Sequence, residues 1–377
     1  MRSSNLQRHR GVTLIELMVG LAIGLVILLA VFQIYGTWDG RQRTGSAKND
    51  AQMVGTLAAV SLEHDLRQAA HGFGPASSPT ELRTGCLTSA FFGAVFTFNL
   101  MPVEIINGAA GASDQINVIY GSSGHRSTRE WVVGSTATTK TLINRAGFMA
   151  GDHVVLSNSV VANTCQLVEI TAATTALVGD PRSFWHATGA YQSAYNAVGV
   201  LTNATMNDAA GTGVNEFDQA FNLGPAPQAN SWRIGGASPL RPVLQRTNRF
   251  PTNGVASAAV EVAEGIVNLQ AQYGYDADGN GQIAANEWLN AAPAVPDWSR
   301  LLAVRYGLLA RSRNYEALPF RAPNPTWSGG QFVMADISNS PGGADSNPLG
   351  ANNWRAYRHM VYEGVIPMRN VLWGQAL

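Results

Sequence analysis

The chain has 377 residues, of which 46% are hydrophobic and only 13% are charged, and its lysines plus arginines balance its aspartates plus glutamates at 25 each. This apolar content excludes a wholly disordered chain, and the zero formal net charge provides no field that would favour nucleic acid as a partner. The 39 glycines, among many small polar residues, are typical of a β-rich domain outside the cytoplasm.

The first predicted element is an apolar helix near the N-terminus. Residues 12–35 (VTLIELMVGLAIGLVILLAVFQIY) contain one charge, Glu16, and follow a polar segment that carries Arg2, Arg8 and Arg10. At about 1.5 Å per residue this helix is long enough to cross a hydrocarbon core of ~30 Å. Basic residues before a span stay in the cytoplasm, so the rest of the chain is predicted to lie outside it.

The candidate cleavage point is Gly11, directly before this run, because no small-residue signal-peptidase site follows it. Residues 10–19 (RGVTLIELMV) resemble the cleavage and methylation motif of type IV prepilins. The resemblance implies that a dedicated peptidase cuts after Gly11 and that Val12 becomes the N-methylated first residue. The usual first residue in that family is Phe, so Val12 departs from the pattern.

Glu16 is the one acid inside the span. A carboxylate within a membrane is costly and normally marks a function or a partner. The prepilin resemblance makes Glu16 the fifth residue of the mature chain and implies that it meets the N-terminal amine of a neighbouring subunit during assembly. The alternative is an acid tolerated near the cytoplasmic headgroups, five residues beyond Gly11.

Beyond the span the helix is predicted to continue over residues 36–72. The polar stretch 36–48 contains three glycines, which predicts a strained or interrupted helix there. Helical spacing then resumes, and an i, i+4 stripe is predicted to pack on the rest of the chain; it consists of Val54, Ala58, Leu62, Leu66 and Ala69.

The remainder, residues 73–377, is predicted to be a β-rich head. Short apolar runs indicate strands at 115–120, 152–156, 165–170 and 301–309, whereas 202–258 and 318–352 are expected to be loops. The predicted fold class is therefore α+β: a leader (1–11), a membrane-spanning helix (12–35) with its continuation, and an antiparallel sheet domain with long loops.

Three later blocks resemble the PilW family of minor pilins: residues 261–276 (EVAEGIVNLQAQYGYD), 301–312 (LLAVRYGLLARS) and 354–373 (WRAYRHMVYEGVIPMRNVLW). The resemblance implies a subunit for type IV pilus assembly or tip priming. It would reside in the inner membrane of a bacterium with its head in the periplasm, and then in the pilus or at the cell surface. The implied partners are other major and minor pilins, the prepilin peptidase, the inner-membrane assembly platform and a large tip adhesin.

Residues 276–287 (DADGNGQIAANE) match the EF-hand calcium loop, with a glycine at its sharp turn and oxygen ligands at positions 1, 3, 5, 7 and 12. We expect a structural Ca²⁺ in a lone loop, because strand-like residues precede it, and a short helix opening at residue 287. The alternative is a polar turn without metal. The predicted ligands are Asp276, Asp278, Asn280, Gln282 and Glu287.

The chain has two cysteines, Cys86 and Cys165, and they do not lie in a metal-binding spacing. A disulfide between them is the natural expectation outside the cytoplasm, and two buried free thiols are the alternative.

The sequence contains no H-E-x-x-H, G-x-S-x-G or Walker A motif, so a structural rather than an enzymatic role is expected. Two alternatives stay open at this point. One is a minor pseudopilin of a type II secretion system, and the other is a membrane-anchored, calcium-dependent periplasmic hydrolase.

Overall fold

The computed structural model describes residues 13–74, 85–91, 95–126, 128–136, 138–158, 165–173, 180–186, 190–192, 200–202, 217–238, 241–250, 257–293, 297–313, 322–337 and 353–373. The chain divides into two compact units, Met1–Asp50 and Ala51–Leu377. The second unit is the head, and it contains all the strands of the described residues.

Helix α1 (Leu14–Gln68) runs without a break from the first unit into the second. The predicted interruption at 36–48 is therefore wrong. A glycine costs only about 1 kcal/mol in a helix interior, and this stretch contains no proline and several good helix formers, such as Arg41, Gln42 and Ala47. The helix ends where Ala70 and Gly72 adopt positive φ angles of 66° and 90°.

The largest sheet of the head has eight strands in the order β2-β1-β8-β7-β12-β5-β6-β9. An additional pairing of β8 with β9 closes the six strands from β8 to β9 into a ring. The strands are β1 (Leu87–Phe91), β2 (Val95–Asn99), β5 (Glu130–Ser135), β6 (Thr139–Leu142), β7 (His153–Ser157), β8 (Cys165–Ala173), β9 (Ser183–His186) and β12 (Gln219–Gly224).

Two smaller antiparallel sheets form the rest of the head. One has the order β15-β14-β13-β4-β3, with β3 (Val103–Ile106), β4 (Gln115–Tyr120), β13 (Gln228–Ser238), β14 (Arg241–Asn248) and β15 (Val260–Glu264). The other has the order β17-β16-β18-β21, with β16 (Ile266–Tyr275), β17 (Trp288–Leu289), β18 (Leu301–Arg311) and β21 (His359–Pro367).

Short elements complete the described structure. Two strand pairs are β10 (Ala190–Gln192) with β11 (Val200–Thr202) and β19 (Thr326–Trp327) with β20 (Gly330–Gln331). The short helices are η1 (Ala109–Gly111), η3 (Ala285–Glu287), η4 (Trp298–Arg300), η5 (Asn353–Ala356) and α2 (Arg369–Trp373).

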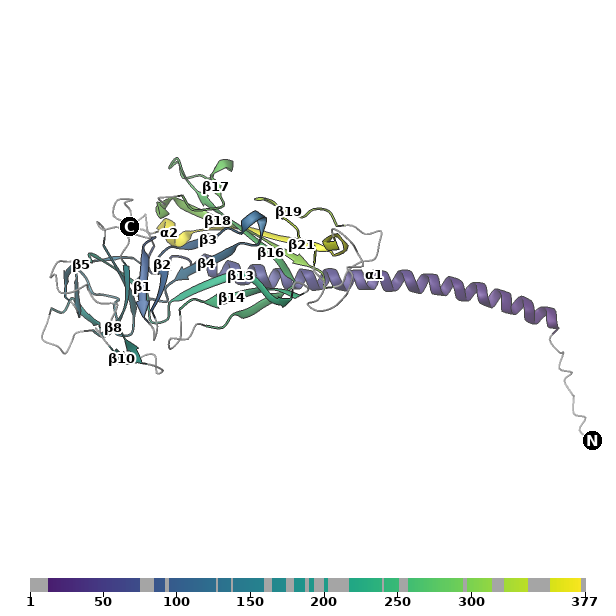
Figure 1. The fold of residues 1–377 in the computed structure, drawn as a ribbon, viewed down its shortest axis with the longest axis horizontal. Helices are drawn as coiled ribbons and strands as arrows, with labels where there is room; N and C mark the ends of the chain where they lie inside the picture. The colour runs from purple at the N-terminus through teal and green to yellow at the C-terminus, as the bar shows by residue number, and fades with distance from the viewer. Residues whose placement is uncertain are drawn as a thin grey trace, which may run out of the picture. The chain divides into compact units, whose positions relative to one another are not determined.

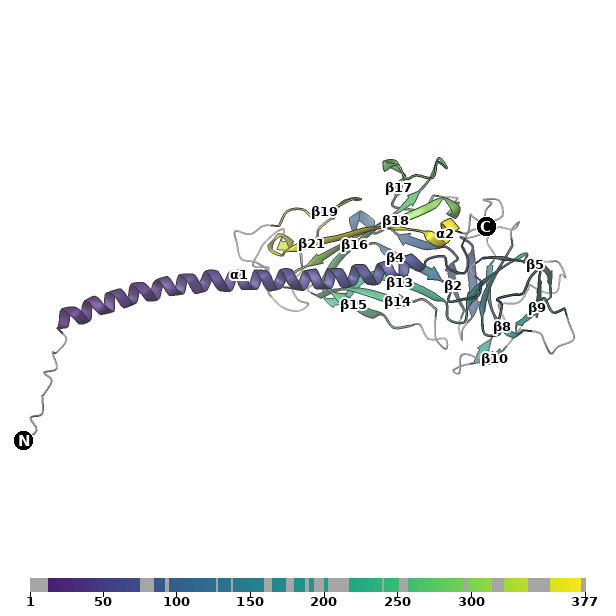
Figure 2. The ribbon, with the colours of Figure 1, turned by 180° about the vertical axis from the view of Figure 1, so that it is seen from behind.

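Within the head, the C-terminal part of α1 lies alongside both smaller sheets, with β13 and β14 on one side and β16, β18 and β21 on the other (Figures 1 and 2). The predicted stripe is confirmed, because Ala58, Leu62, Leu66 and Ala69 are all buried in the hydrophobic core. Burying such side chains is the main favourable term that holds a helix on a sheet.

A buried acid adds polar contacts to this packing. The carboxylate of Asp65 accepts hydrogen bonds from the Tyr120 hydroxyl (2.9 Å), the Asn230 amide (3.0 Å) and the Trp232 indole N–H (2.8 Å). These donors lie on β4 and β13, so one helical residue fixes the position of α1 on the five-stranded sheet.

The four predicted strands are all confirmed as β4, β7, β8 and β18. The expectation of loops over 202–258 is wrong in part, because β12, β13 and β14 lie there. These strands lack an apolar sequence pattern because they bury polar side chains such as Gln219, Asn222 and Asn230, which are hydrogen-bonded inside the fold.

Candidate functional sites: the apolar helix and the acidic loop

The apolar part of α1 has the properties of a membrane anchor. Residues 14–35 have a mean hydropathy of 2.8, and none of that surface is buried within the described structure. Leu25 is 62% exposed and Phe32 is 67% exposed, so the segment presents apolar side chains on every side. A helix that is apolar all round is stable only when lipid or other helices surround it.

The start of this helix is closed by a capping box. The Glu16 carboxylate accepts hydrogen bonds from the Thr13 backbone N–H (3.0 Å) and hydroxyl (2.9 Å), while the Thr13 hydroxyl accepts from the Glu16 N–H (3.3 Å). This exchange satisfies N–H groups that have no partner within the helix. All of these bonds to the carboxylate use Oε2, and Oε1 makes no hydrogen bond within the described residues. Gly11 and Val12 lie outside those residues.

The second candidate site is the loop that connects β16 to β17. It brings together the carboxylates of Asp276, Asp278 and Glu287, whose oxygens lie within 4.8 Å of one another. Asp276 and Glu287 are buried and Asp278 is exposed. Three carboxylates this close can offer a hard cation several oxygen ligands.

Backbone N–H groups hold the two buried carboxylates in place. Asp276 accepts from the N–H groups of Gly279 (2.7 Å), Asn280 (3.1 Å) and Gly281 (2.8 Å). Glu287 accepts from those of Ala277 (2.8 Å) and Ala284 (2.7 Å), so it ties the end of the loop to its start.

These hydrogen bonds also favour the ionised carboxylates. Burial opposes ionisation of Asp276, but the N–H groups of Gly281 and Gly279 outweigh it and hold the pKa of that carboxyl below its ordinary value. The N–H groups of Ala284 and Ala277 lower the pKa of Glu287 in the same way. At neutral pH the loop therefore concentrates negative charge in a small volume.

The other predicted ligands follow in the same loop. The Asn280 side chain donates to Asp278 (2.8 Å) and accepts from the Gln282 N–H (2.7 Å), so it holds the exposed side of the turn. Gly279 and Gly281 both have a φ of 77°, which a residue with a side chain seldom adopts. The sequence pattern therefore corresponds to a formed turn.

The residues on either side of the loop pack it against β16, and they correct one expectation. The prediction of a short helix that opens at Glu287 is wrong, because η3 ends at that residue and the chain continues from Trp288 as strand β17. Trp288 pairs with Gly274 on β16. The missing side chain of Gly274 leaves the space that the side chains of Ile283 and Trp288 fill.

Sequence reasoning missed one residue beside the loop. The Arg300 guanidinium donates to the Ala277 carbonyl (2.7 Å) and forms an ion pair with Asp297 (3.4 Å). No local pattern signals Arg300, because only the pairing of β16 with β18 brings it to the loop.

The predicted disulfide is present. Cys86 and Cys165 are joined, with their Cα atoms 5.9 Å apart, across the parallel pairing of β1 with β8. The bond ties the β1–β2 hairpin to the ring of strands. Closing a loop with a sequence separation of 79 contributes about 4.5 kcal/mol in the chain-entropy model.

Two protein-family models match parts of this chain. Residues 6–32 match the model of the Prokaryotic N-terminal methylation motif, and residues 231–370 match that of Type IV Pilus-assembly protein W. These two matches support a PilW-like type IV pilin. No curated protein and no solved structure matches it.

The family match has a clear structural extent. It includes β14, β16, β18 and β21 with the acidic loop, whereas the strands of the eight-stranded sheet lie outside it. The matches support a structural minor pilin of a type IV pilus that associates with other pilins and the assembly machinery, and α1 contains the candidate membrane anchor.

Proposed function

We propose that the PilW-like pilin is cut after Gly11, methylated at Val12 and used in type IV pilus assembly or tip priming. The observation that carries this proposal is the apolar helix that starts directly after the cleavage motif and contains a single acid, Glu16. The basic residues before the span favour an inner-membrane protein with its head in the periplasm before it enters the pilus. The prepilin peptidase, the assembly platform, major and minor pilins and a tip adhesin are the corresponding partners.

The capping box supports the proposed role of Glu16 in assembly. Its Oε1 makes no hydrogen bond within the described residues, so it can accept one from the Val12 amine of a neighbouring subunit without breaking the bonds to Thr13. That contact neutralises two charges that are both costly in lipid.

Mass spectrometry of the mature chain and of sheared pili tests this role. The mature N-terminus should be methylated Val12, and Glu16→Ala should insert normally, because the span becomes more apolar, but should be lost from pili. The matched control is Asp50→Ala, which removes an exposed acid further along α1 and should retain incorporation. Incorporation of Glu16→Ala at the wild-type level would contradict the proposal.

We also propose that the acidic loop binds Ca²⁺ and stabilises the head. The cluster of Asp276, Asp278 and Glu287 supports this, because three close carboxylates repel one another without a cation. A lone loop outside the cytoplasm is expected to have a Kd of about 10⁻⁴–10⁻³ M.

Thermal unfolding of the full chain in detergent, with calcium or with chelator, tests the metal. A calcium concentration one hundred times Kd stabilises the folded state by about 2.7 kcal/mol. Asp276→Asn and Glu287→Gln keep a hydrogen-bond acceptor but remove a charge, and each should abolish the calcium-dependent rise in Tm. Glu261→Gln, on β15, is the matched control and should retain it. Equal Tm values for the unmodified chain in chelator and in about 100 mM calcium, which is one hundred times the weakest expected Kd, would refute calcium binding.

A further inference from the structure

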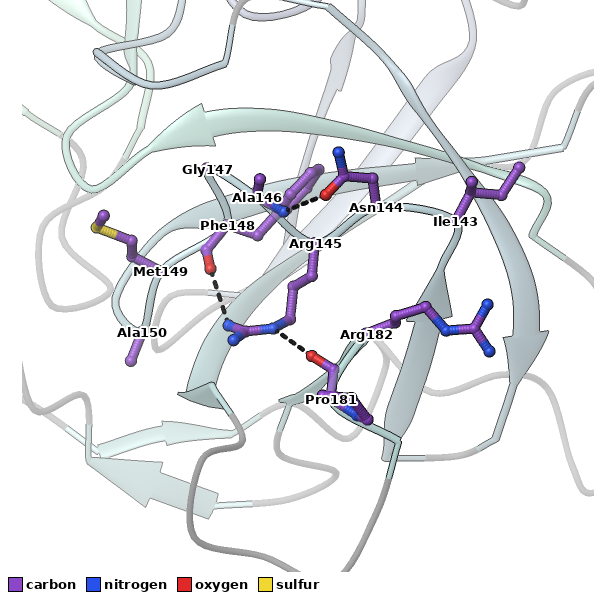
Figure 3. A pocket seen from close by; sticks show the side chains of 10 residues that line it. All are labelled: Ile143, Asn144, Arg145, Ala146, Gly147, Phe148, Met149, Ala150, Pro181 and Arg182. Atoms are coloured by element: carbon purple, nitrogen blue, oxygen red, sulfur yellow. Dashed lines mark hydrogen bonds between the residues drawn. The ribbon is translucent and has the colours of Figure 1, made fainter.

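A pocket at the turn between β6 and β7 has no role in the functions described above. It has a volume of about 460 Å³, which is within the range of ligand pockets. The turn and the residues just before β9 form its walls (Figure 3). The lining residues are those at 143–150 together with Pro181 and Arg182.

Arg145 is fixed in this pocket by backbone carbonyls. Its Nε donates to the Pro181 carbonyl (2.9 Å) and its Nη1 to the Phe148 carbonyl (3.3 Å), as Figure 3 shows. Its Nη2 makes no hydrogen bond within the described residues. Two neutral carbonyls hold the guanidinium in one orientation but do not cancel its charge.

Arg182, in the same pocket, differs from Arg145 because a carboxylate neutralises its charge. Its guanidinium extends away from that of Arg145 and binds both carboxylate oxygens of Asp180. By comparison, no carboxylate of the described residues lies within 4 Å of Arg145. The charge of Arg145 is therefore the one in this pocket that a ligand can neutralise.

The walls beside Arg145 are apolar and open. Ile143 is 53% exposed and Met149 is 50% exposed, and they lie on different sides of the guanidinium (Figure 3). In the same turn, the buried ring of Phe148 stacks on Phe184, with 6.0 Å between ring centroids. This stacking packs the turn against β9.

We propose that the pocket binds an acidic peptide segment of a partner protein, with one carboxylate on Arg145 and apolar side chains on Ile143 and Met149. A guanidinium held through its Nε and Nη1 presents its remaining N–H groups to a carboxylate in a fixed orientation. An extended peptide suits this surface better than a compact ligand, because apolar contacts are available on both sides of the charge. The site is independent of the acidic loop and of membrane anchoring.

Fluorescence polarisation on the full chain in detergent tests this site. The probe is a labelled, amidated peptide Gly-Leu-Glu-Leu-Gly, and its matched control replaces Glu with Gln. The Glu peptide should bind at least tenfold more tightly at low salt. Arg145→Gln should remove this preference, while Arg313→Gln, which deletes an exposed arginine paired with Glu264, should preserve it.

A second pair of variants leaves the hydrogen bonds of Arg145 intact. Met149→Asp places a competing carboxylate in the pocket and should abolish binding, whereas Met149→Ser should weaken it only several-fold. Equal affinity for the Glu and Gln peptides, or binding of neither at millimolar concentration, would overturn the proposal. If 4-methylvalerate competes with an affinity equal to that of the peptide, the occupant is a small carboxylate and the peptide assignment is wrong.

Discussion

The two halves of α1 share one helical backbone but differ in the surface that each requires. Over residues 14–35 every side chain is exposed, although nearly all of them are apolar. Over residues 51–68 one stripe of apolar side chains is buried in the core, whereas the opposite side is exposed and carries polar residues together with Met53, Leu57 and Val60. The first pattern needs lipid or neighbouring helices around it, whereas the second needs one packed face.

The two halves of α1 are therefore expected to serve different processes: the first half assembly and the second half folding of the head. Substitutions in the first half should change membrane or filament contacts and leave the stability of the head unchanged. Those at buried positions of the second half should destabilise the head, because Leu62, Leu66 and Asp65 lie in its core. Measurements of head stability can therefore test the division.

The largest expected effect is that of Asp65→Ala. The change leaves the Tyr120 hydroxyl and the Trp232 indole N–H buried without their acceptor, and it weakens the bonding of Asn230. Each buried donor left unpaired costs about 1–3 kcal/mol, so we expect a loss of about 4 kcal/mol in the free energy of unfolding. Urea unfolding of the full chain in detergent, followed by tryptophan fluorescence, measures it.

Asp50→Ala is the matched control, since Asp50 is an exposed acid of the same helix. It should change the unfolding free energy by no more than about 0.5 kcal/mol. Asp65→Asn keeps one acceptor oxygen and should fall between the two. Equal urea midpoints for Asp65→Ala and Asp50→Ala would show that the buried network does not hold the helix on the sheet.

A pair of leucine substitutions should give the next largest effect. Leu62 is fully buried, and Leu62→Ala should destabilise the head by about 3 kcal/mol through lost burial and the cavity left behind. Leu25→Ala makes the same chemical change in the exposed apolar half and should leave head unfolding unchanged. A shift of equal size from both variants would mean that the two halves are not energetically distinct.

The same contrast explains what the sequence could predict. The apolar run and the i, i+4 stripe are periodic patterns that report the environment directly, and both are confirmed. Asp65 gives no such signal, because a single acid in a helix is usually on the surface. Only the fold brings Tyr120, Asn230 and Trp232 around it, and the polar strand β13 was missed for the same reason.

The acidic loop and the pocket around Arg145 also differ in how far the sequence could predict them. The acidic loop is contiguous, so its spacing predicted which carboxylates would meet, and Asp276, Asp278 and Glu287 do lie together. The pocket around Arg145 combines residues 143–150 with Pro181 and Arg182, two segments that the sheet pairing brings together. No spacing rule identifies such a site from the sequence.

The smallest expected effect concerns pH, and it also distinguishes the head from the apolar half. Burial, together with the positive charge of Arg311, lowers the pKa of His359 to about 4. Because the folded pKa is depressed and the unfolded chain binds the proton more readily, stability is complete above pH ~6.5 and declines as the pH falls toward 4. For this residue we expect a loss of about 2 kcal/mol between pH 7.5 and pH 5.

Urea unfolding of the full chain at a series of pH values tests this expectation. His359→Phe should reduce the loss of unfolding free energy at low pH in part rather than abolish it, because burial also lowers the pKa of His153. His64→Gln, which replaces an exposed histidine of α1, should keep the wild-type slope. If His359→Phe declines as steeply as the wild-type chain, protonation of His359 is not what weakens the head in acid. The exposed apolar half should insert equally at both pH values, since Glu16 is the only charged residue in it.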